Sequence, residues 1–138
     1  MLARMADAFT WLDTHMPGAL DDPDEHFDWI AMATDEEWIR LLAAYPSRTA
    51  AWREAFVLVV AEAPPQRGYQ ALALGLRDAE PAVRAQAGLS FVDLNDVNED
   101  EGADAITAAM WADLRKVAED PDDALDDLRT FLQRVSVG

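Results

Sequence analysis

Apolar residues recur three or four positions apart along most of the chain, which is the spacing of one face of an α-helix. The most regular stripes are Leu2, Met5, Phe9, Leu12 and Met16; then Ala103, Ile106, Met110, Leu114 and Val117; and finally Leu125, Leu128, Leu132 and Val135. The segment 49–63 is apolar nearly all round, which predicts a central helix with neighbours on several sides. No segment reads convincingly as a strand, so the pattern predicts an all-α protein.

Capping residues, prolines and polar stretches divide these stripes into about eight helices. Thr34 and Glu37 form a capping-box pattern in front of one of them. The most polar stretch, 95–102, is the best candidate for a loop. We therefore expect one all-helical domain over 1–138, built from four stacked helix hairpins, with an irregular helical bundle as the alternative.

Residues 71–94 carry a more specific pattern, in which an apolar helix ends at an aspartate-containing turn and the next helix opens with proline. This pattern resembles a HEAT-type repeat, and the match rests on Asp78, Pro81, Val83, Arg84 and Ala87. The resemblance implies antiparallel helix hairpins stacked as an α-solenoid. It also implies a binding or scaffolding role, because such folds present an extended surface and supply no active-site cleft of their own.

The charge of the chain narrows the choice of partners. It has 138 residues, with 27 acidic and 11 basic side chains and a formal charge of −16. A negative field of this size repels nucleic acid and anionic membranes, so we expect neither as a partner and favour a basic protein. Acidity that serves only solubility or salt adaptation is an equally open interpretation.

Several classes of protein are disfavoured by what the sequence lacks. Without cysteine there is no disulfide, thiolate metal site or cysteine nucleophile. The amino end lacks the basic and apolar segments of a signal peptide, and the longest apolar run, 55–61, is far shorter than the roughly 20 residues of a membrane span. We therefore expect a cytoplasmic protein that is not an enzyme and needs no cofactor.

Two patterns of metal ligands are incomplete. Asp96, Asn98 and Asp100 match the first half of a calcium loop, but Gly102 comes one position late and Thr107 stands where the closing glutamate belongs. A solvated acidic loop is favoured there. A second group, comprising His15, Asp22, Asp24 and His26, has potential zinc ligands at a spacing that fits no established site.

The leading functional hypothesis is a small acidic protein-binding module, in its most concrete form an immunity protein that neutralises a basic toxin such as a nuclease. The alternative is a structural or regulatory accessory subunit that docks through an apolar face; a metal-dependent sensor or enzyme is a third. The acidic residues predicted to contact the partner are Asp96, Glu99, Asp100, Glu101, Asp104, Asp122, Asp123, Asp126 and Asp127. Trp111, one of five tryptophans, is the predicted aromatic anchor.

Overall fold

The computed structural model describes residues 7–98 and 101–137, and in these residues the chain is helical with no β-strand. The α-helices are α1 (Ala8–His15), α2 (Asp24–Met32), α3 (Asp35–Ala44), α4 (Ala50–Val59), α5 (Pro65–Gly75), α6 (Pro81–Asn98), α7 (Ala108–Ala118) and α8 (Asp126–Val137). Short 3-10 helices lie between them: η1 (Met16–Leu20), η2 (Tyr45–Ser47), η3 (Val60–Glu62), η4 (Ala103–Ala105) and η5 (Asp123–Leu125). The predicted all-α class is confirmed.

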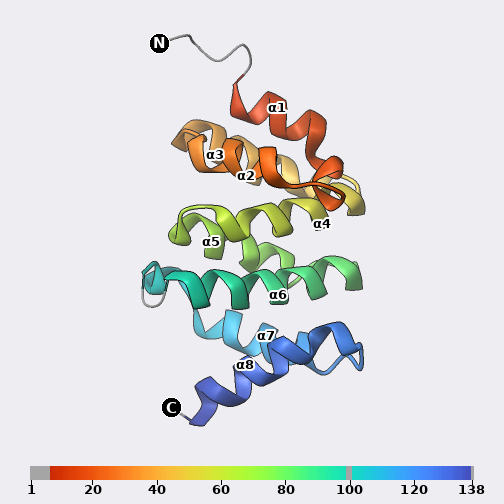
Figure 1. Ribbon diagram of the computed structural model, residues 1–138, viewed down its shortest axis with the longest axis vertical. Coiled ribbons are helices and arrows are strands. Elements are labelled where there is room, and N and C mark those ends of the chain that lie inside the picture. The colour runs from red at the N-terminus through yellow and green to blue at the C-terminus, as the bar shows by residue number, and fades with distance from the viewer. Residues whose placement is uncertain (1–6, 99–100, 138) are drawn as a thin grey trace.

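The helices succeed one another along the long axis of the molecule, with α1 and α8 at opposite ends of that axis (Figure 1). Helix α4 packs against α6, and α6 packs in turn against α8. Contacts of α6 with α8 occur near Gly88 and Leu128 and again between Asp96 and Arg134, so these two helices run in the same direction. None of the described helices is long and apolar enough to cross a membrane.

A continuous cluster of buried side chains runs through this arrangement. Leu12 of α1, Phe56 of α4, Phe91 of α6 and Phe131 of α8 all belong to it and are almost fully buried. Burying one such side chain stabilises the fold by about 1.5–3 kcal/mol. The predicted central helix is confirmed as α4, which buries residues on several sides and begins after Thr49, whose hydroxyl accepts a hydrogen bond from the Trp52 amide.

The capping box predicted at Thr34 is confirmed. The Glu37 amide donates to the Thr34 hydroxyl at 3.1 Å, and the Thr34 amide donates to the Glu37 carboxylate at 2.8 Å. Glu37 is buried and also accepts a hydrogen bond of 2.5 Å from the amide of Ala8. One side chain therefore caps α3 and fastens the first turn of α1 to it.

Close packing explains a glycine inside α5. A Cβ built on Gly75 would lie 2.6 Å from Cγ1 of Val57 in α4 and 2.9 Å from Cβ of Ala87 in α6. The missing side chain lets α5 approach both helices, which no other residue would allow without a shift of the backbone or of Val57.

Two predicted boundaries near the carboxyl-terminal part are wrong. The loop expected over 95–102 begins later, because α6 continues to Asn98, where the side-chain amide donates to the Leu94 carbonyl oxygen at 2.8 Å. The helix expected from Ala103 begins only at Ala108, after Thr107 caps it by accepting from the Met110 amide. Of the first predicted stripe, Leu2 and Met5 lie outside the described residues.

Candidate functional site

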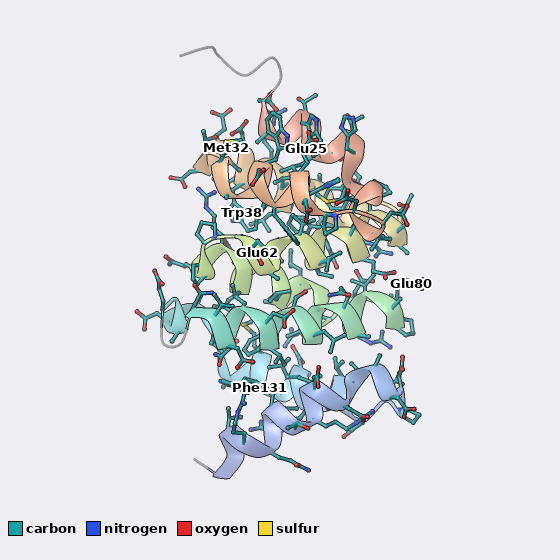
Figure 2. All side chains as sticks on the ribbon, in the orientation of Figure 1. Glu25, Met32, Trp38, Glu62, Glu80 and Phe131 are labelled. Carbon is teal, nitrogen blue, oxygen red and sulfur yellow. The ribbon has the colours of Figure 1, made fainter. Side chains whose placement is uncertain are left out.

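Acidic side chains are exposed on every part of the molecule, as Glu25, Glu62 and Glu80 illustrate at three places in Figure 2. The basic side chains are used differently. Within the described residues, seven arginines form ion pairs with aspartates: Arg40, Arg48, Arg53, Arg67, Arg77, Arg129 and Arg134. Most of the positive charge is therefore already neutralised inside the molecule, and the uncompensated charge at the surface is negative.

Two of the predicted contact residues, Asp96 of α6 and Asp127 of α8, come together on one surface with Asp93. Asp93 is exposed, but neighbouring protein atoms displace part of the water around its carboxyl, and this desolvation raises its pKa. The negative charges of Asp96 and Asp127 raise the pKa of Asp93 further. We call Asp93, Asp96 and Asp127 the acidic face.

A basic side chain lies beside the acidic face. Arg134 of α8 contacts Asp96 at 3.1 Å, with more than half of each side chain exposed. Such an exposed pair contributes only about 0–1 kcal/mol, so Arg134 remains easy to displace by a partner.

Three other predicted residues, Asp122, Asp123 and Asp126, lie at the turn between α7 and α8. Arg129 organises this turn: its guanidinium donates to the main-chain oxygens of Ala118, Asp120 and Asp122, and to the Asp126 carboxylate at 2.6 Å. The carboxylate of Asp122 accepts from the Ala124 amide and caps η5. These hydrogen bonds thus fix the backbone that carries the exposed acids of this turn.

The remaining predicted acids belong to the connection between α6 and α7. Glu101 and Asp104 are exposed, whereas Glu99 and Asp100 lie outside the described residues. Gly102 has a positive φ of 77°, which glycine adopts without strain, and its Cα faces Pro65 and Gln66 so closely that a Cβ would clash with them. This connection packs against the start of α5, away from the turn that Arg129 organises.

Trp111, the predicted anchor, is partly buried in an aromatic group. Its ring stacks on Phe131 at a centroid distance of 6.2 Å and meets the edge of Phe91 at 5.5 Å. Both phenylalanines belong to the core. Trp111 therefore stabilises the packing of α6, α7 and α8, and only part of its surface remains for a partner.

Neither of the two incomplete metal patterns is assembled in the part of the chain that the structure describes, which contains no group of three or more potential ligands suited to an ion. Asp96 pairs with Arg134, Asn98 bonds to its own helix, and Asp100 lies outside the described residues. His26 is buried, and its Nε2 lies 2.7 Å from the His15 carbonyl oxygen. Its ring meets the edge of the Trp11 ring.

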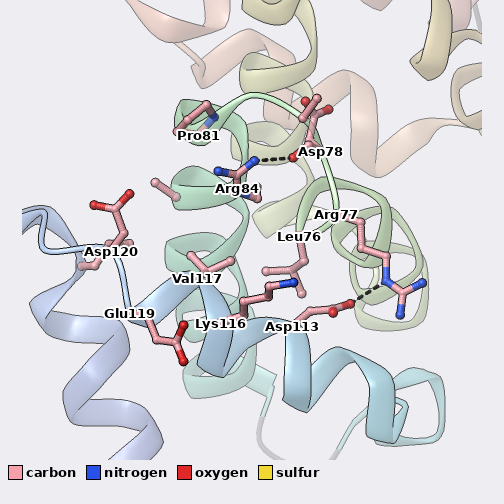
Figure 3. Close-up of a pocket in the computed structure, with 13 residues that line it drawn as sticks. Leu76, Arg77, Asp78, Pro81, Arg84, Asp113, Lys116, Val117, Glu119 and Asp120 are labelled. Carbon is pink, nitrogen blue, oxygen red and sulfur yellow. Dashed lines mark hydrogen bonds and ion pairs between the residues drawn. The ribbon is translucent and has the colours of Figure 1, made fainter.

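A cleft of about 850 Å³ lies where the turn between α5 and α6 faces the end of α7 (Figure 3). Its apolar wall includes Leu76, Val117 and Leu125, and the basic residues Arg84 and Lys116 line it as well. Sequence reasoning did not assign a site here, nor did it single out Asp93. For Asp93, the available signal was its position one helical turn before Asp96.

A buried polar network supports one wall of the cleft. The carboxylate of Asp78 accepts hydrogen bonds from the Tyr45 hydroxyl at 2.5 Å and the Glu80 amide at 2.9 Å, and it pairs with Arg53 at 3.2 Å. Arg84 donates to the Asp78 main-chain oxygen at 2.7 Å. Burial, followed by the hydrogen bond to Asp78, raises the pKa of Tyr45.

Comparison with protein-family models, with curated proteins and with solved structures finds no match to this chain. Its function must therefore be argued from its own residues.

Proposed function

We propose that this protein is a protein-binding module that uses its acidic surface to bind a basic partner. In its most concrete form it is an immunity protein that neutralises a basic toxin such as a nuclease. The observation that carries the proposal is the crowding of Asp93, Asp96 and Asp127: desolvation raises the pKa of Asp93, and repulsion by Asp96 and Asp127 raises it further. A cationic partner relieves this repulsion, so binding gains electrostatic free energy at a place where the free protein is destabilised.

The pairing of the basic residues also supports the proposal that the partner is basic. Because the described arginines mostly pair with aspartates within the molecule, a partner approaching the acidic face meets little competing positive charge. Complementary fields of this kind raise association rates by 10 to 10³ and make them fall steeply with salt.

As the scaffold for this surface we propose stacked antiparallel helix hairpins of the HEAT-like kind. Polar contacts between residues 32 to 38 positions apart support it, since they recur from one end of the described chain to the other. Examples are Asp13 with Arg48 at a separation of 35, Tyr45 with Asp78 at 33, and Asp96 with Arg134 at 38. A nearly constant separation is what contacts between equivalent positions of successive repeats produce.

The alternative, an accessory subunit docking through an apolar face, has less support. The large apolar side chains that are exposed come from different elements: Leu20, Met32, Ile39, Leu74, Val97 and Val135. Each of these elements contributes only one of them, so no described helix presents an apolar face of large side chains. Together with the packing of Trp111, this favours the charge-driven interface.

The test compares two variants that carry the same change in net charge. The face variant combines Asp93→Asn, Asp96→Asn and Asp127→Asn. The matched control combines Asp21→Asn, Asp28→Asn and Glu62→Gln, which are exposed residues of other elements. A basic protein captured from source cells on the wild-type chain is purified, and its association rate with each form is measured between 50 and 500 mM NaCl, a range that spans Debye lengths from about 14 to 4 Å.

We expect the face variant to associate at least about tenfold more slowly at low salt, with a shallower salt dependence, and the control to stay within about twofold of wild type. Equal effects of both variants would show that only net charge matters and would refute the proposed face. If the captured partner is a nuclease, the wild-type chain should inhibit it in a one-to-one mixture, and failure to inhibit would refute the immunity version.

A further inference from the structure

Two basic side chains, Lys116 and Arg84, line the cleft between the α5–α6 turn and the end of α7, which is unusual in so acidic a protein. Lys116 is the only lysine of the chain and is exposed at the cleft. Among the described residues no carboxylate lies within ion-pair distance of Lys116 or Arg84. Arg84 makes a single hydrogen bond there, to the main-chain oxygen of Asp78. Both cations therefore retain hydrogen-bond donors for a ligand.

The acidic side chains around the cleft are largely engaged elsewhere. Asp113 is paired with Arg77 at 2.7 Å, and Asp78 is paired with Arg53 on the buried side. Asp120 accepts a hydrogen bond from the Asp122 amide within its own turn. Figure 3 shows Lys116 extending toward Leu76 and away from Glu119. Glu119 and Asp120 also line the cleft and keep their negative charge, so Lys116 and Arg84 can act on a ligand through direct contact rather than through a net positive field.

The cleft also has an apolar wall. Leu76, Val117 and Leu125 line it; Leu76 keeps 3% and Val117 7% of its surface exposed, whereas Leu125 is fully buried. The cleft volume of about 850 Å³ falls within the range of about 300–1,000 Å³ that is typical of sites for small ligands. An occupant that contacts this wall needs an aliphatic group, and one that reaches Lys116 and Arg84 needs an anion.

We propose that this cleft is a binding site for a carboxylate joined to a branched aliphatic group, with Lys116 and Arg84 holding the carboxylate and Leu76 and Val117 contacting the aliphatic group. A free branched-chain organic acid and the leucine-like carboxyl terminus of a peptide share this chemistry. At physiological salt the Debye length is about 8 Å, so the many acids elsewhere on the molecule are screened while the two cations act directly. The site needs neither the acidic face nor a basic partner and goes beyond the proposed function.

The experiment is a titration of the isotope-labelled protein followed by amide NMR shifts, with 4-methylpentanoate and with its uncharged analogue 4-methylpentanamide as probes. A second arm uses the tripeptide Gly-Gly-Leu with a free and with an amidated carboxyl terminus. The variant Lys116→Gln removes the cation from the cleft. Arg115→Gln is the matched control, because it removes the same charge from the neighbouring exposed position of α7 that does not line the cleft.

We expect saturable shifts of the backbone amide signals of Ala79 and Ala85 with at least one carboxylate probe. The uncharged probes, 4-methylpentanamide and the amidated tripeptide, should cause no such shifts. Lys116→Gln should weaken binding by about tenfold, the effect of losing one charge-assisted hydrogen bond, while Arg115→Gln should change it by less than about twofold. Binding of the free acid identifies a small-molecule site, and binding of the tripeptide alone identifies a peptide terminus. The proposal fails if neither carboxylate binds, if the amides bind equally well, or if both variants lose affinity to the same extent.

Discussion

Replacing Asp78 should destabilise the fold more than any other single loss of a carboxylate, because this side chain joins three elements. Its carboxylate is 1% exposed and contacts Tyr45 of η2, Arg53 of α4 and the Glu80 amide that precedes α6. Asp78→Ala leaves Arg53 and the Tyr45 hydroxyl without their acceptor. Breaking a buried ion pair costs about 3–5 kcal/mol. Arg53 keeps 19% of its side chain exposed, so water can solvate it and the lower end, about 3 kcal/mol, applies.

Two milder variants separate the contributions. Tyr45→Phe removes one hydrogen bond and should cost about 1 kcal/mol, and Asp78→Asn keeps the shape but removes the charge and should cost an intermediate amount. The double variant should cost less than the sum, since the Tyr45–Asp78 hydrogen bond can be lost only once. Urea unfolding followed by circular dichroism gives each free energy, provided the slope with urea is unchanged. A cost below about 0.5 kcal/mol for Asp78→Ala, or strictly additive variants, would refute this reasoning.

The same network predicts a dependence on alkaline pH. The pKa of Tyr45 is raised in the folded state, so above pH 10 the folded protein binds more protons than the unfolded chain. Stability must therefore fall as the pH rises through and above about 10, where an unfolded tyrosine ionises. The pKa of Tyr69 is raised too, but Tyr69 is present in both proteins. Tyr45→Phe should accordingly lose less stability than wild type between pH 9 and 11, and identical slopes would contradict the assignment.

Two further substitutions test the packing and the acidic face. In an exposed helix, a change from glycine to alanine stabilises the protein by about 1 kcal/mol. Gly75→Ala should instead lower stability by about 1–3 kcal/mol, because the new Cβ would overlap Val57 and Ala87. An unchanged or raised melting temperature would contradict this. Asp93→Asn should stabilise the protein at pH 7 by up to about 0.5 kcal/mol. This gain should shrink as the pH falls through the range in which carboxyls titrate, because the raised pKa of Asp93 makes the wild type relatively more stable when Asp93 is protonated. A pH-independent difference in unfolding free energy would exclude the repulsion.

Local patterns predicted the helices well wherever a few neighbouring residues determine the structure. The capping box at Thr34 and Glu37 needs only a spacing of three, and both hydrogen bonds are present. The carboxyl end of α6 was misplaced because asparagine and aspartate are poor helix formers and typical of loops. In the folded chain Asp96 meets Arg134 of α8 and Leu94 is fully buried, so tertiary contacts extend the helix beyond its local preference.

The site was less predictable, since it depends on which helices meet. Asp96 and Asp127 were both predicted contact residues, but they lie far apart in the sequence, and only the packing of α6 on α8 brings both next to Asp93. Helix propensity alone disfavours a glycine at position 75, whereas the structure shows that Gly75 permits the close approach of α5 to α4 and α6. Lys116 gave no signal in the sequence beyond being the sole lysine.

The pairing of arginines with aspartates within the molecule is linked to the negative charge of its surface. Arg48, Arg67 and Arg77 each reach an aspartate 32 to 36 positions away, so they join elements that are neighbours in space rather than in sequence. A planar guanidinium that forms two parallel hydrogen bonds, as Arg48 does with Asp13 at 2.7 and 3.0 Å, suits this task better than a lysine. Because arginines used in this way are already paired with aspartates, they do not offset the charge of the other exposed acids, and solubility alone would not require arginines to join separate elements.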